Sequence, residues 1–202
     1  MASVTSPAAS ETLVRQRPEA APQPFRVSVE NYYKMAKVGI LTDGKRYELI
    51  HGVIYEAQPI SPEHNYAVQS LTDQLRTCTG ETAVVFSQGP ARFGDDSEPQ
   101  PDILVLRPPA ERYRRRHPAP DDVLLIIEVA STTLKTDRTL KLHLYARAGI
   151  PEYWILNLAK NSLEVYRKPD GEEGRYLEMT TLGEGESAVP VGLEGCGVRW
   201  WQ

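Results

Sequence analysis

The chain has 202 residues, of which 41% are hydrophobic and 25% are charged, and its formal net charge is −4. This composition is typical of a soluble globular protein with one substantial core. No apolar run approaches the ~20 residues that a membrane helix requires, and no signal peptide is visible, so we expect a cytoplasmic protein without a membrane partner.

Residues 1–24 are rich in Ala, Pro, Ser and Gln, which predicts a disordered tail, and residues 25–202 are expected to form a single domain. Ser28 is a suitable N-cap for a short first helix. Two short strands around His51-Gly52 then carry a hairpin signal.

A helix is predicted over residues 62–79, because Ser61 is a good N-cap and Pro62 suits the first helical position. Further predicted elements are strands at 82–89, 90–93, 101–107, 123–130, 150–158 and 162–168, and a helix at 136–149 that Thr136 caps. The strand, helix, strand order over residues 122–158 favours a right-handed crossover between parallel strands. The fold class is therefore α/β or α+β, with a mixed sheet and helices packed on it.

The two cysteines, Cys78 and Cys196, lie far apart in the sequence, and neither has a second Cys or His beside it. This spacing argues against structural zinc and against a disulfide framework. We expect two free thiols in a reducing cytoplasm.

Charge is unevenly distributed along the chain. Residues 101–150 contain nine Lys/Arg and six Asp/Glu, a net charge of +3, and include the run "RYRRRH". Its arginines, Arg112 and Arg114 to Arg116, form either a solvated loop or a loop that contacts phosphates.

Three carboxylates stand where strand propensity alone would not place them. Glu48 lies in the first strand pair, Asp102 opens the strand "DILVLR", and Glu128 interrupts the apolar run "LLIIEVAS". Each has a structural alternative: Glu48 facing solvent, Asp102 in ordinary turn chemistry, and Glu128 in a buried ion pair.

Carboxylates at the ends of neighbouring buried strands can also converge, and they repel one another unless a cation lies between them. Oxygen ligands suit a hard ion such as Mg²⁺ or Mn²⁺, which lowers the pKa of a bound water and neutralises phosphate charge. Lys141 could supply a positive group near such a water. It shares one helical face with Asp137 and Tyr145, and an exposed lysine paired with Asp137 is the alternative.

The motifs resemble those of the Uma-two family of restriction-endonuclease-type proteins, within the PD-(D/E)XK nuclease superfamily. The resemblance covers roughly residues 28 to 200 and rests on "YELIHGVI", "SPEH", "PDILVLR", "LLIIEVAS", "DRTLKLHLYARAGIPEYWIL" and "SLEVYR", in that order. It implies a restriction-endonuclease-like core, a central mixed sheet flanked by helices.

The resemblance also implies roles for individual residues. Asp102 matches the Asp of the PD motif and Glu128 the second acidic residue, while Ala130 stands where the superfamily usually has its lysine. Lys141 matches the lysine that this family carries on the following helix. Glu48 would be a further metal ligand, and the main-chain carbonyl of Val129 would complete the metal shell.

The leading hypothesis is accordingly a Mg²⁺- or Mn²⁺-dependent DNA endonuclease, with Asp102, Glu128 and Lys141 as catalytic residues. His64, in "SPEH", also matches a family position and is a candidate nucleic-acid contact, although a histidine that merely packs is an equal alternative. Two other functions stay open: a non-catalytic nucleic-acid-binding or protein-interaction module, and cleavage of RNA or a specialised DNA structure. A homodimer is plausible, because superfamily members often dimerise.

Overall fold

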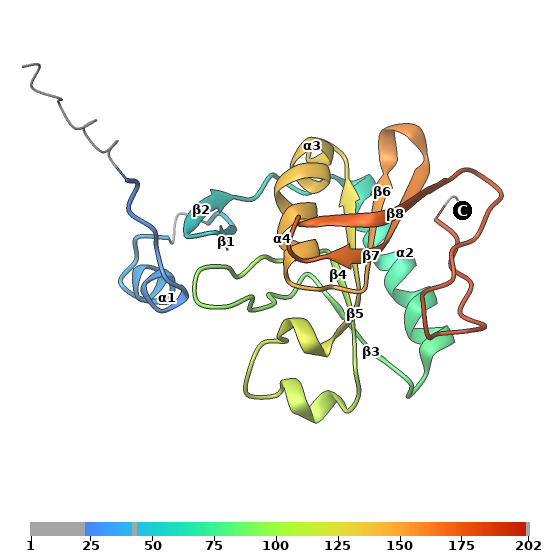
Figure 1. Cartoon of the computed structure of the whole chain (residues 1–202), viewed down its shortest axis with the longest axis horizontal. Coiled ribbons are helices and arrows are strands. Elements are labelled where there is room, and N and C mark those ends of the chain that lie inside the picture. Colours follow the sequence, from blue (N-terminus) through green and yellow to red (C-terminus); the bar gives the residue numbers. More distant parts are fainter. Residues whose placement is uncertain (1–22, 42–43, 201–202) are drawn as a thin grey trace, which may run out of the picture.

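A computed structural model describes residues 23–41 and 44–200 (Figure 1), so most of the expected tail at 1–24 lies outside the described residues. The helices are α1 (Val29–Lys37), α2 (Pro62–Thr79), α3 (Leu134–Thr136) and α4 (Leu142–Arg147). The strands are β1 (Tyr47–Ile50), β2 (Val53–Glu56), β3 (Val84–Ser87), β4 (Ile103–Leu106), β5 (Val123–Ala130), β6 (Glu152–Asn157), β7 (Ser162–Asp170) and β8 (Arg175–Leu182).

The six strands β3 to β8 form one mixed sheet in chain order, and β1 and β2 form a separate hairpin. Only β5 and β6 pair in parallel within the larger sheet, and α3 and α4 lie between them in the chain. The predicted mixed sheet with packed helices and the predicted parallel crossover are both confirmed.

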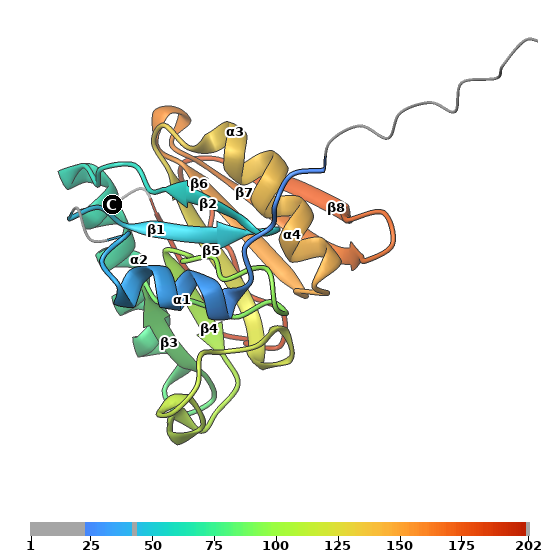
Figure 2. The same ribbon diagram turned by 90° about the vertical axis from the view of Figure 1, so that its left-hand side faces the viewer.

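Helices cover both faces of the sheet (Figures 1 and 2). On β5, Leu125, Ile127 and Val129 pack toward α2, whereas Ile126 and Ala130 pack toward α4. Burying each large aliphatic side chain contributes roughly 1.5–3 kcal/mol, so a strand that is apolar on both faces is stable only between two such layers. The layers explain the apolar run around Glu128 and place its side chain on the α4 face.

The local signals of the sequence set the element ends near the site. The hydroxyl of Ser28 accepts a hydrogen bond from the N–H of Asn31, and the hydroxyl of Ser61 accepts one from the N–H of His64. His51 and Gly52 have φ values of 49° and 70°. Positive φ at both central residues is what a two-residue hairpin turn requires, so the hairpin prediction is confirmed.

Two predicted elements differ in the structure. Residues 90–93 form a loop, because the N–H groups of Ala91 and Phe93 bond Pro99 and Ser97 within the same loop instead of a sheet strand. The crossover helix begins at Leu134, and its middle turn, Asp137–Lys141, is a π turn. Thr136 therefore lies inside the helix and does not cap it.

The prediction of two free thiols is wrong, because Cys78 and Cys196 form a disulfide with their Cα atoms 4.9 Å apart. The C-terminal segment folds back onto α2, where the side chain of Gln74 bonds both the N–H and the C=O of Arg199. Because the two cysteines are 118 residues apart in the chain, no local sequence pattern predicts their contact. The expectation of a cytoplasmic location rested in part on two free thiols, and the disulfide removes that argument.

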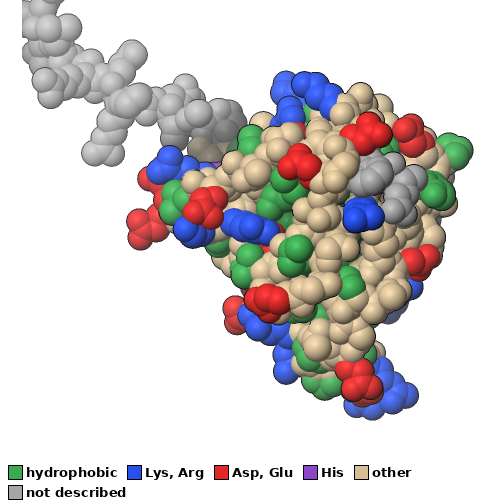
Figure 3. Space-filling view, turned by 90° about the vertical axis from the view of Figure 1, so that its right-hand side faces the viewer, with side chains coloured by type: hydrophobic (Ala, Val, Ile, Leu, Met, Phe, Trp, Pro, Cys, Tyr) green, Lys and Arg blue, Asp and Glu red, His purple; other side chains and the backbone are tan. Residues whose placement is uncertain are grey.

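The side of the molecule that carries the C-terminus shows charges of both signs interspersed with single hydrophobic side chains (Figure 3). Within the described residues, no helix combines the length and the apolar character that crossing a membrane would require.

Candidate active site

Two of the singled-out carboxylates meet across the β4–β5 pair. Ile103 pairs with Ile127, so Asp102 and Glu128, one step further along, lie opposite each other on the face toward α4. Asp102 Oδ2 accepts a hydrogen bond of 2.8 Å from the main-chain N–H of Val129. The register therefore brings Asp102, Glu128 and the backbone of Val129 together.

Lys141 and Tyr145 reach Glu128 from the crossover helix. The Lys141 ammonium donates to Glu128 Oε1 at 3.0 Å, and the Tyr145 hydroxyl donates to the same oxygen at 2.7 Å. Lys141 is only 7% exposed, which excludes the alternative of a solvated helix lysine. The π turn that ends at Lys141 is a rare feature that often occurs at functional sites.

Glu48 joins the cluster from β1. Its Oε1 lies 3.5 Å from Lys141 Nζ, and its Oε2 accepts a hydrogen bond from the N–H of Gln100 at 3.2 Å. The side chain is 13% exposed, so Glu48 faces the site and not open solvent. The hairpin thus supplies a third carboxylate.

Asp137 is a fourth carboxylate, which the sequence suggested only as an ion-pair partner of Lys141. Its Oδ2 accepts a hydrogen bond from the Thr133 hydroxyl at 2.6 Å, and its Oδ1 lies 4.0 Å from Lys141 Nζ. That Oδ1 is buried and accepts no hydrogen bond from a described residue. Burial raises the pKa of Asp137 to about 6, although Lys141 and Thr133 act to lower it. In the sequence, the four-residue spacing of Asp137, Lys141 and Tyr145 indicated that these side chains share one face of the helix.

His64 contacts the cluster through Asp102. Its Nε2 lies 3.1 Å from Asp102 Oδ2, and its Nδ1 is buried without a hydrogen-bond partner among the described residues. The N-terminal turn of α2, fixed by Ser61, holds the ring in place. The structure therefore places His64 beside Asp102 at the wall of the candidate site, and its role as a nucleic-acid contact stays a prediction.

All these side chains except Tyr145 line one cavity of about 360 Å³. The segment after β5 contributes Ser131 and Thr132 to its wall, and the segment after β2 contributes Pro59 and Ile60. A volume of this size accommodates a small polar group such as part of a phosphodiester.

The charges in the cavity are strongly coupled. Burial raises the pKa of Glu128 well above its ordinary value, and the neighbouring carboxylates add to this effect while Lys141 opposes it. Burial acts to lower the pKa of Lys141, but Glu128, Glu48, Asp137 and Asp102 raise it by more, so the net shift is upward. Lys141 thus keeps its proton, and its chemistry is that of a fixed cation.

Carboxylate oxygens of the kind gathered here are the ligands that hard divalent cations prefer. Four carboxylates surround one lysine, and the hydrogen bonds from described residues leave the second oxygen of both Asp102 and Glu128 unused. A further cation would offset the carboxylate repulsion that, after burial, adds to the raised pKa of Glu128. No three His, Cys, Asp or Glu side chains within residues 23–41 and 44–200 are arranged to hold an ion as they stand. Mg²⁺ commonly takes only one or two carboxylates and keeps several waters, as Asp102 and Glu128 would allow.

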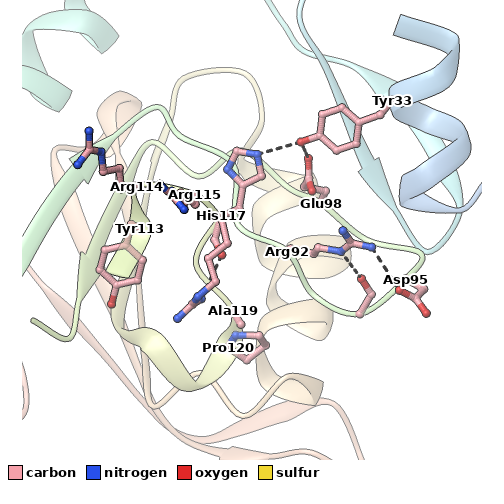
Figure 4. A pocket seen from close by; sticks show the side chains of 12 residues that line it. Tyr33, Arg92, Asp95, Glu98, Tyr113, Arg114, Arg115, His117, Ala119 and Pro120 are labelled. Carbon is pink, nitrogen blue, oxygen red and sulfur yellow. Dashed lines mark hydrogen bonds and ion pairs between the residues drawn. The ribbon is translucent and has the colours of Figure 1, made fainter. Parts of the chain in front are cut away.

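The predicted arginine loop lies apart from this cavity. It precedes β5, and Glu128 follows Val123 by five residues, which is about 16 Å of strand at ~3.3 Å per residue. Arg112 and Arg116 pair with Asp122. Arg114, Arg115 and Arg116 instead line a second, open cavity of about 820 Å³ (Figure 4), whose other charged or aromatic lining residues are Tyr33, Arg92, Asp95, Glu98, Tyr113 and His117.

Comparison with solved structures supports the fold. A chain titled as a putative nuclease of DUF820 from Anabaena variabilis ATCC 29413 superposes with a TM-score of 0.64 and 18% identity, over 82% of this chain and 89% of that one. No curated protein matches. Residues 29–199 match the family profile of Uma2, described as "Putative restriction endonuclease". The chain therefore belongs to the Uma2 family, the Uma-two family that its motifs resemble.

Proposed function

We propose that this protein is a divalent-metal-dependent endonuclease that hydrolyses phosphodiester bonds of DNA. The observation that carries the proposal is the buried contact between Lys141 and Glu128, opposite Asp102, on the wall of a cavity open to a substrate. Its family and its structural neighbour support nuclease activity in general.

Asp102 and Glu128 would hold Mg²⁺ or Mn²⁺, with Glu48 assisting directly or through water and the Val129 carbonyl completing the shell. When bound, the ion would lower the pKa of a coordinated water and neutralise charge on the phosphate. Two side chains hold the carboxylates in place: Tyr145 donates to Glu128, and His64 contacts Asp102.

Lys141 would orient the attacking water and offset negative charge on the pentavalent phosphate. Its raised pKa keeps it protonated, which favours electrostatic stabilisation over proton abstraction. The arginine loop, Arg112 and Arg114 to Arg116, would contact phosphates outside the cleaved bond.

The test is incubation of supercoiled, linear and single-stranded DNA with the purified protein in Mg²⁺ or Mn²⁺. We expect cleavage that EDTA abolishes and that a Glu128→Gln preparation, purified in parallel, lacks. DNA that stays intact in both metals would overturn the proposal. Salt-dependent binding without cleavage would instead identify a non-catalytic nucleic-acid-binding module.

A further inference from the structure

The open cavity of about 820 Å³ has a lining unlike that of the candidate active site. Its walls come from α1, from the loop before β4 and from the loop before β5 (Figure 4). Four arginines line it, against two acidic residues, Asp95 and Glu98. The cavity is therefore basic, although the chain as a whole is acidic.

Two of these arginines have no ionic partner in the part of the chain that the structure describes. Arg92 pairs with Asp95 and Arg116 pairs with Asp122, but no described residue forms an ion pair with the exposed side chains of Arg114 and Arg115. Unpaired guanidinium groups at the wall of a cavity suit phosphate oxygens, which they bind in a bidentate manner.

An aromatic surface faces the same cavity. The rings of Tyr33 and His117 have planes 4° apart and centroids 6.4 Å apart, and the Tyr33 hydroxyl lies 3.0 Å from His117 Nε2 (Figure 4). Because this hydrogen bond joins the rings at their edges, they lie side by side and nearly parallel. Tyr33 is 43% exposed and His117 is exposed, so the broad surface that they form is open to a ligand.

Buried Glu98 fixes the orientation of this surface. The main chain of Glu98 forms an isolated bridge with Leu49, and its Oε1 accepts a hydrogen bond from the Tyr33 hydroxyl. Burial and Glu98 raise the pKa of Tyr33, so the hydroxyl keeps its one proton and donates it to the carboxylate. The Tyr33 oxygen must then accept from the Nε2–H of His117. The chain Glu98, Tyr33, His117 thus holds both rings before any ligand arrives.

The cavity lies close to the candidate active site. Glu98 lines the basic cavity, while Gln100 and Asp102 line the cavity of Glu128. Asp102 is four positions after Glu98 in the chain, and four fully extended residue steps span at most about 14 Å. A nucleic-acid strand advances ~3.4 Å per nucleotide even in a duplex, so about four nucleotides cover this distance. One strand can therefore reach both cavities.

We propose that this basic cavity binds one unpaired nucleotide of the nucleic-acid substrate, a few nucleotides away from the bond that is cleaved. The base stacks on the Tyr33–His117 surface, and Arg114 and Arg115 bind the adjoining phosphates. A base within a duplex is already covered on both faces, so the stacking requires a base outside the helical stack. This inference rests on the proposed nuclease function for the identity of the ligand, but it concerns binding and is testable without cleavage.

The test is fluorescence anisotropy of a labelled single-stranded oligodeoxynucleotide, and of its duplex, with the wild-type protein in EDTA at fixed salt. Tyr33→Leu is expected to weaken single-strand binding about tenfold, as losses of base–aromatic stacking commonly do, and duplex binding less than twofold. Tyr66→Leu, which removes another exposed tyrosine that lines neither cavity, is the control. Arg115→Ala should weaken binding more than Arg175→Ala, which removes an exposed arginine of β8.

A scan of the oligonucleotide provides a test that needs no protein variant. Replacing one base at a time by an abasic site should weaken binding to the wild-type protein mainly at one position. The oligonucleotide that is abasic at that position should bind Tyr33→Leu and the wild-type protein with equal affinity. Uniform losses along the strand, equal effects of Tyr33→Leu and Tyr66→Leu, or no measurable single-strand binding would overturn the inference.

These results separate the two proposals. Tyr33-dependent binding without any cleavage in Mg²⁺ or Mn²⁺ would support the nucleotide site and reject the nuclease. Cleavage that is unaffected by Tyr33→Leu, together with Tyr33-independent binding, would reject the site and leave the nuclease in place.

Discussion

Lys141 Nζ lies 3.0 Å from Glu128 Oε1, and both side chains are almost entirely buried between the sheet and the crossover helix. Desolvating two charges costs several kcal/mol for each ion, which their attraction repays only in good geometry. Here Tyr145 adds a hydrogen bond to the same oxygen, and Glu48 and Asp137 add negative charge around the lysine. The contact therefore bears on the stability of the fold, and the same two side chains line the candidate active site.

Lys141→Met is expected to lower the free energy of unfolding by about 3–5 kcal/mol, because it leaves buried carboxylates without their cation. Adding Glu128→Gln to it should restore part of that loss, since the double variant has no charge at either position. Urea unfolding measures both effects, with Lys135→Met, on the exposed side of the same helix, as control. Additive losses in the double variant would show that the pair is not coupled.

Metal binding should be visible without catalysis. Mg²⁺ or Mn²⁺ at a hundred times its dissociation constant stabilises a native protein by about 2.7 kcal/mol, if only the folded state binds it. We expect thermal unfolding of the wild-type protein to shift upward with either ion. Asp102→Asn and Glu128→Gln should remove the shift, and Asp121→Asn, at an exposed carboxylate, should retain it. A shift of equal size in all four proteins would contradict the assigned ligands.

The ion pairs of Asp122 should make stability depend on pH in the acid range. The Arg116 hydrogen bond is the main cause that lowers the pKa of Asp122 to about 2. A lowered pKa means that the stabilisation is complete above the unfolded value of about 3.9 and disappears as the pH falls toward 2.

Asp122→Asn should therefore reduce the free energy of unfolding by about 1–2 kcal/mol at pH 7, since water screens the half-exposed arginines. The difference from wild type should shrink between pH 4 and pH 2, as urea unfolding at several pH values would measure. Asp121→Asn should show no such trend. A difference that is constant over this range would mean that Asp122 carries no lowered pKa.

Local signals in the sequence were sufficient for most of the fold. Ser28 and Ser61 cap helices, His51-Gly52 forms a hairpin turn, and the apolar run around Glu128 forms a central strand. Each signal depends on residues within a few positions of one another. The parallel pairing of β5 with β6 also followed from the strand, helix, strand order of residues 122–158.

The site needed contacts between distant residues, which the sequence alone does not contain. The approach of His64 to Asp102 depends on how α2 packs against the sheet, and the Tyr33–His117 contact joins segments 84 residues apart. The π turn at Asp137–Lys141 has no local motif that distinguishes it from an α-helix. The residues themselves made Glu48 and Lys141 candidates, and the family resemblance supplied the roles proposed for them.

The Cys78–Cys196 disulfide should contribute substantially to stability. It closes a loop of more than a hundred residues, and removing a native disulfide typically costs about 2–5 kcal/mol. We expect a reducing agent to lower the free energy of unfolding of the wild-type protein by that amount, and to leave the Cys78→Ala/Cys196→Ala variant unchanged. Alkylation in denaturant without reductant should label neither cysteine. If both cysteines are labelled, the purified protein contains the two free thiols that the spacing in the sequence predicted.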